Sequence, residues 1–264
     1  MWKRKLLERA RSATIPRRIW MAESAAADAG NKLAEIVKTA RVTTDLIRVG
    51  SEGDGGYLIP DDLEGIDALL SPGVSTVCDF DLAFAKRGIP VFMADASVDA
   101  PPISHENFHF QKKFIDIYDS DQTIRFSTWF ASCDLTKSND LVLQMDVERA
   151  EYRIISSIPD ELLLRFRIII VEFHNVEEVF SAFSSDLIIA CFKKLTRYFN
   201  IVHIHPNNND VMFQVGKFKT SPTMEFTFYR KDRPFAAGIP KTPHPLDVDC
   251  VPSKPSVTLS ATWG

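Results

Sequence analysis

The chain has 264 residues, of which 45% are hydrophobic and 25% are charged, as in an ordinary globular protein. Its formal net charge of −4 excludes the strong positive field typical of nucleic-acid-binding proteins. No apolar run reaches the ~18 residues that a membrane span requires. We therefore expect a large buried core, no nucleic-acid partner and no transmembrane segment.

The first 20 residues form a basic segment. They contain seven Lys or Arg and one Glu, a formal charge of +6. Such a segment could contact an anionic partner or a membrane surface, or it could be a solvated helix. No long apolar region or cleavage site follows Met1, so the sequence predicts no signal peptide.

Four cysteines lie far apart in the sequence and show no C-x-x-C spacing, which argues against a zinc site. Reduced, buried thiols in a cytoplasmic protein are the expectation for such residues. They are Cys78, Cys133, Cys191 and Cys250.

The chain begins with a predicted helical extension, residues 1–44. Alanine-rich stretches favour helix through residue 40, with a break predicted at Gly30-Asn31. Residues 45–63 then predict a strand, a turn with four glycines in seven residues, and a return to extended chain.

The next stretch predicts a βαβ unit. A short apolar strand at 66–70 leads to a turn at 71–75, a helix at 78–86 and a strand at 90–94. Asp95 ends that strand, 22 residues after Gly73. Nucleotide-binding βαβ units place a ribose-binding carboxylate about 20 residues after the glycine turn.

Strands and helices continue to alternate beyond this unit. The predicted strands are 108–115, 140–146 and 166–172, and the predicted helices are 122–133, 150–157 and 176–199. This alternation predicts an α/β fold with a mostly parallel sheet.

The end of the chain departs from that alternation. Residues 201–205 and 224–229 predict two strands with no helix between them, and hence an antiparallel hairpin at the sheet edge. We expect a Rossmann-like, seven-stranded, mostly parallel sheet ending in this hairpin, within a domain of residues 45–232. The proline-rich tail, 233–264, has no periodic segment and is either mobile or pinned across another surface.

Ligands of open α/β sheets bind at the carboxyl ends of the strands. The expected cofactor site is therefore the turn of Ser71, Pro72 and Gly73 together with Asp95 and Ser97. A turn without a ligand and a solvated strand-end carboxylate are the structural alternatives.

A second group of polar residues follows the two central strands. Asp146 and Glu172 end these strands, and His174 shares a strand face with Glu172. Convergence of the three side chains would suit proton abstraction from a hydroxyl, with His174 or Asp146 as the base. Asp146 and Glu172 could also hold a divalent cation such as Mg²⁺. Purely structural hydrogen bonds are the alternative.

Several segments resemble the FkbM-type family of S-adenosylmethionine-dependent O-methyltransferases. The segment from Leu143 to Tyr152, LQMDVERAEY, resembles the family pattern K-x-D-x-E-G-x-E. Further similarity lies in IVEFH at 170–174, HIHPNN at 203–208 and GDGGYLIP at 53–60.

This resemblance implies a class I methyltransferase that transfers a methyl group from S-adenosylmethionine to a hydroxyl of a saccharide, glycolipid or natural product. It implies that Asp146 also contacts the cofactor. The small-molecule or saccharide acceptor would contact Tyr57, Glu148, His205 and Asn207. A homo-oligomer is compatible with the sequence.

Two departures from the family pattern bear on these expectations. Arg149 stands where the family has glycine, and Phe80-Asp81 follows a turn that lacks the usual glycine-rich string. Two alternative functions stay open at this point. They are an NAD-dependent oxidoreductase and a catalytically silent, methyltransferase-like binding protein, which Arg149 would favour.

Overall fold

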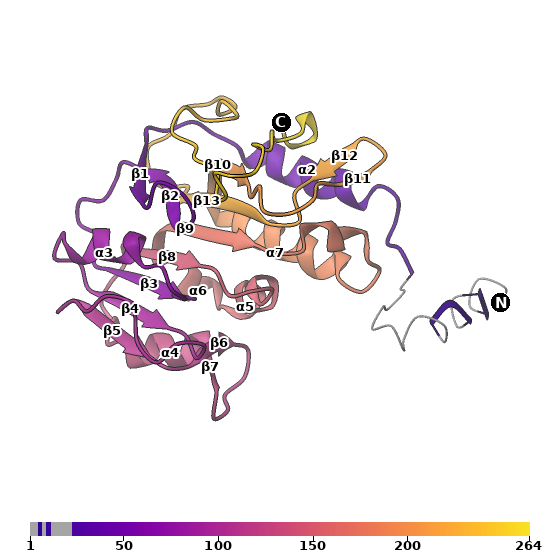
Figure 1. Ribbon diagram of the computed structural model, residues 1–264. Helices are drawn as coiled ribbons and strands as arrows, with labels where there is room; N and C mark the ends of the chain where they lie inside the picture. The colour runs from indigo at the N-terminus through magenta and orange to yellow at the C-terminus, as the bar shows by residue number, and fades with distance from the viewer. Residues whose placement is uncertain (1–4, 7–8, 12–22) are drawn as a thin grey trace.

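A seven-stranded mixed sheet forms the centre of the computed structural model, which describes residues 5–6, 9–11 and 23–264 (Figure 1). Most of the basic segment 1–20 lies outside these residues. In spatial order the strands are β10 (Phe199–Pro206), β13 (Met224–Arg230), β9 (Phe166–Phe173), β8 (Leu141–Met145), β3 (Ala68–Pro72), β4 (Val91–Ala94) and β5 (Phe108–Gln111).

Only β13 in this sheet runs against its neighbours. It pairs antiparallel with β9 and with β10, whereas every other neighbouring pair is parallel. The predicted α/β class, the mostly parallel seven-stranded sheet and the late antiparallel pair are therefore confirmed. The structure adds that β13 is inserted between β9 and β10 rather than lying at the edge.

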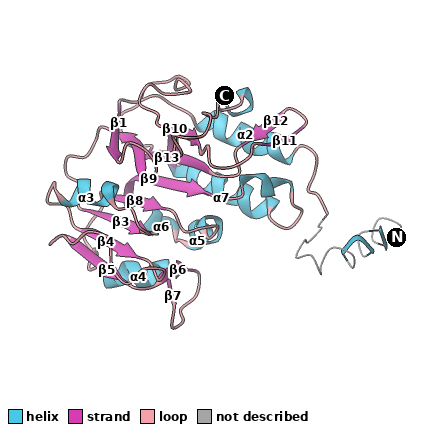
Figure 2. Cartoon of the chain, in the orientation of Figure 1, coloured by secondary structure: helices cyan, strands magenta, loops and turns pink. Residues whose placement is uncertain are grey.

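Each face of the sheet is covered by a different layer (Figure 2). Alternating side chains of the buried strands produce the division: Leu70 belongs to one apolar cluster and Leu69 to the other. The first cluster includes side chains of α2 (Ala29–Ala40), α4 (Phe126–Ser132), α5 (Glu151–Ser157) and α7 (Ser185–Tyr198). The second includes those of α3 (Asp79–Ala85) and of the hairpin formed by β1 (Leu46–Gly50) and β2 (Gly56–Pro60).

Two predictions for the region after β5 are wrong in detail. The strand predicted over 108–115 is interrupted after Gln111 and resumes as β6 (Phe114–Asp116). The helix predicted from residue 122 begins only at Phe126, because β7 (Thr123–Arg125) pairs with β6 in a separate two-stranded sheet. Tertiary pairing overrides helix propensity there.

The long helix predicted over 176–199 is also wrong. A short 3-10 helix, η2 (Val176–Phe180), is separated from α7, and Phe183 between them is 92% exposed. The apolar residues of η2 and of α7 happen to follow one another at helical spacing, so the sequence pattern predicts a single helix. A short helix, α6 (Asp160–Leu163), precedes β9.

The predicted break at Gly30-Asn31 is wrong because Gly30 lies within α2. A Cβ atom at Gly30 would come within 2.6 Å of the Phe180 ring and 2.8 Å of the Phe218 ring. Glycine serves close helix packing at this position rather than a turn.

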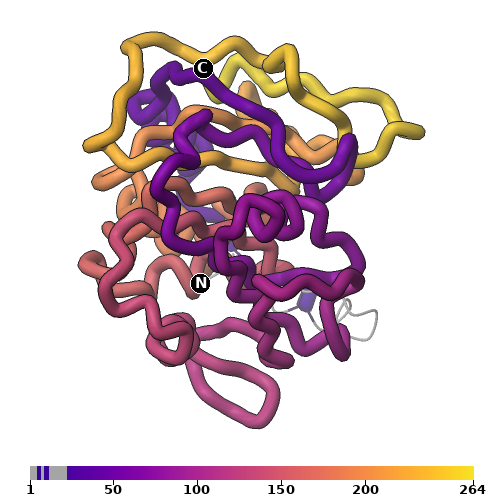
Figure 3. The backbone as a smooth tube through the Cα atoms, turned by 90° about the vertical axis from the view of Figure 1, so that its left-hand side faces the viewer, coloured from indigo at the N-terminus to yellow at the C-terminus, as the bar shows by residue number. Residues whose placement is uncertain are grey.

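The C-terminal tail is pinned to the domain. The Arg41 guanidinium donates hydrogen bonds to the carbonyl oxygens of Pro240, Trp263 and Gly264, and Trp263, in η3 (Ala261–Trp263), is fully buried. Its indole donates to Lys219 in the small hairpin of β11 (Phe213–Val215) and β12 (Phe218–Thr220). The tail, yellow in Figure 3, runs across the top of the molecule. Among the described helices, none is long and apolar enough to span a membrane.

Candidate functional site

The topological switch point of the sheet lies between β3 and β8. The strands that follow β3 in the chain extend the sheet on one side, through β4 and β5, whereas β8 and β9 extend it on the other. A cavity of about 160 Å³ lies at the carboxyl ends of these two strands, lined by residues 73–78 and by Gln144 and Asp146. Open α/β sheets bind their ligands at this place.

A chain of buried hydrogen bonds joins the strands next to this cavity, which is called the smaller cavity below. Ser71 Oγ donates to Gln144 Oε1 at 2.8 Å, and Gln144 Nε2 donates to the Tyr57 hydroxyl at 3.2 Å. Burial raises the pKa of Tyr57 well above its usual value, and nearby Asp146 adds to that shift. The resemblance predicts that Tyr57 contacts the acceptor. In the structure Tyr57 lines this cavity at the switch point.

The turn predicted over 71–75 begins two residues later in the structure, and neither Ser71 nor Pro72 is among the described residues that line the cavity, whereas Gly73 is. Ser71 and Pro72 end β3, and the amide of Gly73 donates to the carbonyl oxygen of Ala94 at the end of β4. The Pro72 carbonyl accepts a hydrogen bond from the amide of Asp146. Backbone contacts therefore join the ends of β3, β4 and β8.

Asp95 fastens two loops at this edge of the sheet. Its Oδ2 accepts a hydrogen bond from the amide of Ser75 at 3.0 Å, and its Oδ1 accepts from the amide and hydroxyl of Ser97 at 2.7 and 2.6 Å. Neither Asp95 nor Ser97 is among the described residues that line the cavity. The carboxylate keeps further lone pairs, which leave a ribose contact chemically open.

A second, larger cavity of about 510 Å³ adjoins the first. The two share Asp54, Asp146 and Glu148 as lining residues. The second cavity is strongly acidic, since Arg149 and His174 are the basic residues among its described lining. Its carboxylates are Asp54, Asp146, Glu148, Glu172, Glu177 and Asp210.

His174 lies at the centre of the acidic cavity wall, just after β9. Its Nδ1 is 3.0 Å from Glu151 Oε1, while its Nε2 lies 3.6 Å from Glu148, 3.7 Å from Glu172 and 3.9 Å from Asp146. The predicted convergence of Asp146, Glu172 and His174 is therefore present in the structure. Burial opposes a charge on His174, but the hydrogen bond and charge of Glu151, together with Asp146 and Glu148, raise its pKa above 6.5.

Glu151 positions this imidazole from beneath. It is fully buried at the start of α5, where its Oε1 also accepts hydrogen bonds from the amides of Val147 and Arg149. The carboxylate thereby holds the loop after β8 and the Nδ1 atom of His174 at the same time. A carboxylate at a helix start is further stabilised by the helix dipole.

The carboxylates of the acidic cavity carry strongly perturbed pKa values. Burial raises the pKa of Asp146 to about 7, with His174 opposing and Glu148 reinforcing the shift. Burial, followed by the charges of Asp146 and Glu225, raises the pKa of Glu172 to about 10. Crowded, desolvated carboxylates of this kind are stabilised in their ionised form by a bound cation.

The residues present fit a divalent cation. Asp146, Glu148 and His174 offer three ligand atoms within 4.8 Å of one another. Asp146 Oδ1 is buried and makes no hydrogen bond. The predicted partner Glu172 approaches the same imidazole at 3.7 Å. Two of these three ligands are carboxylates, and a site in which oxygen ligands predominate suits Mg²⁺ or Mn²⁺.

The two residues expected from the later strands separate in the structure. Asn207 lines the acidic cavity, and its amide donates to Glu172 Oε1 at 3.4 Å. His205 instead faces Asp247 of the tail, with its Nδ1 3.7 Å from Asp247 Oδ2, and lines another cavity of about 230 Å³.

Asp54 is the residue that the sequence interpretation missed. It lies in the turn between β1 and β2 and lines both cavities at the switch point. Its position in Gly53-Asp54-Gly55-Gly56 was the available signal, because an acid amid glycines can approach a ligand closely.

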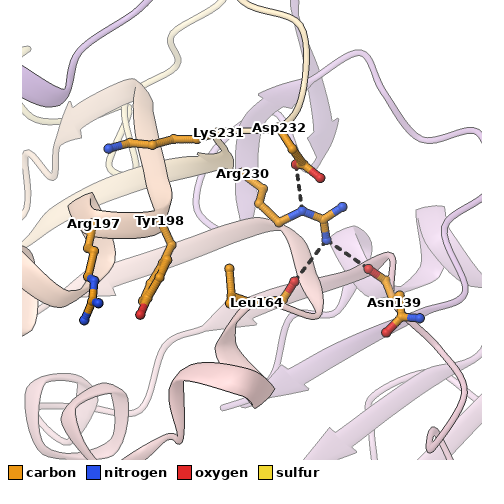
Figure 4. A pocket seen from close by; sticks show the side chains of 7 residues that line it. All are labelled: Asn139, Leu164, Arg197, Tyr198, Arg230, Lys231 and Asp232. Atoms are coloured by element: carbon orange, nitrogen blue, oxygen red, sulfur yellow. Dashed lines mark hydrogen bonds and ion pairs between the residues drawn. The ribbon is translucent and has the colours of Figure 1, made fainter.

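A further cavity, of about 460 Å³, lies at the opposite end of the sheet, where β8, β9 and β10 begin. Figure 4 shows the side chains that line it. Arg230 within it already donates to the carbonyl oxygens of Asn139 and Leu164 and pairs with Asp232. Arg230 is therefore engaged in structural contacts, and the lining of this cavity lacks a cluster of carboxylates and imidazole like that of the acidic cavity.

No protein-family model matches the sequence, and no curated protein matches it. The site must therefore be interpreted from its own residues.

Proposed function

We propose that this protein is an S-adenosylmethionine-dependent O-methyltransferase of the class I fold that acts on a hydroxyl of a saccharide, glycolipid or natural product. The observation that carries the proposal is the pair of adjoining cavities at the switch point, which share Asp146 as a common wall. Methyl transfer needs a cofactor and an acceptor held side by side, with one reacting atom directed at the other.

The charge of the smaller cavity favours a cationic cofactor. Its charged lining residues are Asp54, Asp81, Asp146 and Glu148, with no Lys or Arg among the described lining. S-adenosylmethionine carries a sulfonium, an ammonium and a carboxylate group, so it has a net positive charge that these carboxylates would attract. The pyrophosphate of NAD would meet repulsion there, which argues against the oxidoreductase alternative.

Sheet topology adds a second argument by fold analogy. An antiparallel strand such as β13 near the end of the sheet is expected for methyltransferases of this class. A dinucleotide-binding sheet would more often end in a further parallel strand.

The larger cavity would receive the acceptor. His174 Nε2 would take the proton of the acceptor hydroxyl, while Glu151 holds Nδ1 and stabilises the resulting imidazolium. Asp146, on the wall between the cavities, would orient that hydroxyl toward the methyl donor. Asn207 and Glu148 would contact the remainder of the acceptor.

A divalent cation such as Mg²⁺ would fit the same wall. Asp146 and Glu148 would hold it, with Glu172 beside them on the same wall, and His174 Nε2 would stay free to take the proton. The charge of the cation would lower the pKa of the acceptor hydroxyl. The positive charge of a bound cation would offset the mutual repulsion of the ionised carboxylates.

The experiment is mass spectrometry of a saccharide and small-molecule extract incubated with protein and S-adenosylmethionine, with and without Mg²⁺. We expect products heavier by one methylene unit and matching formation of S-adenosylhomocysteine. His174→Gln should reduce product formation at least about 100-fold, the lower range for loss of a general base. Asn139→Ala, at the opposite end of the sheet, is the control. Cofactor binding without turnover on any acceptor would instead favour the silent binding protein.

A further inference from the structure

A second cluster of metal-ligating side chains lies where the C-terminal tail crosses the sheet. His205 of β10, Glu225 of β13 and Cys250 of the tail offer three ligand atoms within 4.8 Å of one another. The sequence argued against a zinc site because it has no C-x-x-C spacing. The fold assembles these three residues from separated positions, which spacing does not reveal.

Strand register brings the two sheet ligands together. Glu225 is the direct partner of His205 in the antiparallel pairing of β13 with β10. On its other side Glu225 pairs with Glu172 of β9. Side chains directly opposite in such a pair share one face of the sheet.

The imidazole of His205 is prepared for a ligand. The residue is 6% exposed, its Nδ1 faces Asp247, and its buried Nε2 has no hydrogen-bond partner. A buried polar atom without a hydrogen-bond partner destabilises the folded state by about 1–3 kcal/mol, so a ligand at Nε2 would remove this penalty. A carboxylate behind the other ring nitrogen is the usual arrangement for a metal-binding histidine.

The thiol and the carboxylate are already adjacent. Cys250 Sγ donates a hydrogen bond to Glu225 Oε1 at 3.2 Å. Tetrahedral zinc, with bonds of about 2.3 Å to sulfur and 2.1 Å to oxygen, separates two such ligand atoms by about 3.6 Å. Cys250 Sγ and Glu225 Oε1 therefore already lie close to the separation that a shared zinc ion requires.

Asp247 is itself held by the surrounding structure. Its Oδ1 lies 2.7 Å from His203 Nε2, and its Oδ2 accepts a hydrogen bond from the amide of His244. Cys250 also lines the acidic cavity, which gives an ion a route to the cluster.

We propose that His205, Glu225 and Cys250 bind one zinc ion that fastens the C-terminal tail to β10 and β13. A nitrogen, an oxygen and a sulfur ligand select zinc over Mg²⁺, which prefers oxygen alone. Binding releases the thiol proton of Cys250 to solvent and leaves a fourth position for water. This site is distinct from the cluster of Asp146, Glu148 and His174.

The test is metal reconstitution of the full-length protein after treatment with a chelator. We expect one equivalent of zinc to remain after gel filtration. With Co²⁺ in its place, a thiolate-to-cobalt charge-transfer band should appear in the near ultraviolet. Cys250→Ser should abolish the band, whereas Cys133→Ser should retain it, because Cys133 is a buried free thiol outside the cluster.

A second variant tests the site independently, in case Cys250→Ser does not fold. His205→Gln should weaken zinc binding at least about tenfold, while circular dichroism reports an intact fold. A band that persists in Cys250→Ser, or zinc binding lost in Asp146→Asn but kept in His205→Gln, would overturn the proposal. Calorimetry with S-adenosylmethionine reports separately on the proposed function, so either can fail alone.

Discussion

Gly73 lies directly against the backbone of Asp146. A Cβ atom at position 73 would lie 1.5 Å from the Asp146 carbonyl oxygen, and Gly73 has a φ of +91°. The two residues follow the adjacent strands β3 and β8, so this contact closes the switch point at which the smaller cavity forms. Only glycine satisfies both the backbone angle and the approach.

Gly73→Ala should therefore destabilise the protein and open this contact. We expect a loss of about 3 kcal/mol or more in the free energy of unfolding, since backbone strain and a backbone clash combine. Urea denaturation measures it. Gly88→Ala is the matched control, because Gly88 has a φ of +78° but nothing within 4 Å of its added Cβ. Equal losses in the two variants would contradict the role of the clash.

Arg149 occupies a position that favours glycine. Its φ is +83°, and the preceding Glu148 has a φ of +51°. Arg149→Gly should stabilise the protein by about 0.5–1 kcal/mol, because relief of left-handed strain exceeds the entropy that glycine costs. Thermal denaturation measures it. Lys137→Gly, at an exposed position without positive φ, should be destabilising by a similar amount. A destabilised Arg149→Gly would show that the arginine side chain itself is needed.

Glu151 supports three hydrogen-bond donors with one oxygen. Glu151→Ala would leave the amides of Val147 and Arg149 and the imidazole of His174 without their acceptor. We expect a loss of about 3–5 kcal/mol in the free energy of unfolding, as for removal of one partner of a buried charged pair. Glu161→Ala, at an exposed position in α6, should change stability by less than about 0.5 kcal/mol. Similar stabilities in the two variants would contradict this role.

Asp62 makes the stability depend on pH. Although its burial opposes the charge, hydrogen bonds from Arg233 and Tyr229 and the charge of Arg167 lower its pKa below 3.8. A depressed folded-state pKa stabilises the protein above the unfolded pKa of about 3.9, and this contribution is lost as the pH falls through the folded value. Asp62→Asn should cost about 2 kcal/mol at neutral pH.

Denaturation in urea across the acidic range checks this sign. The stability difference between wild type and Asp62→Asn should be largest near neutral pH and shrink as the pH falls below about 4. Asp61→Asn, at the exposed neighbouring residue, should leave the profile unchanged. A difference that grows on acidification would contradict the assignment.

Strand ends could be identified from the sequence because buried strands carry continuous apolar runs. That pattern located Asp146, Glu172 and His174 and predicted their convergence. The antiparallel pair of late strands followed from the absence of a helix between them. The position of β13 between β9 and β10 depends on tertiary packing, and no local sequence pattern predicts it.

The contribution of the tail could not be predicted. Asp247 and Cys250 lie in a segment without apolar period, so nothing local indicates which surface they meet. Their contacts with His203, His205 and Glu225 depend on the path of the tail across β10 and β13. The sequence resemblance therefore predicts His205 at the acceptor, whereas in the structure its imidazole faces Asp247.

Calorimetric titration of S-adenosylmethionine tests the central claim most directly. We predict one binding site per chain, no comparable heat with NAD, and at least about tenfold weaker binding in Asp146→Asn, which loses a charge on the wall shared by the two cavities. Absence of binding by the folded wild-type protein, or preferential binding of NAD, would contradict the account.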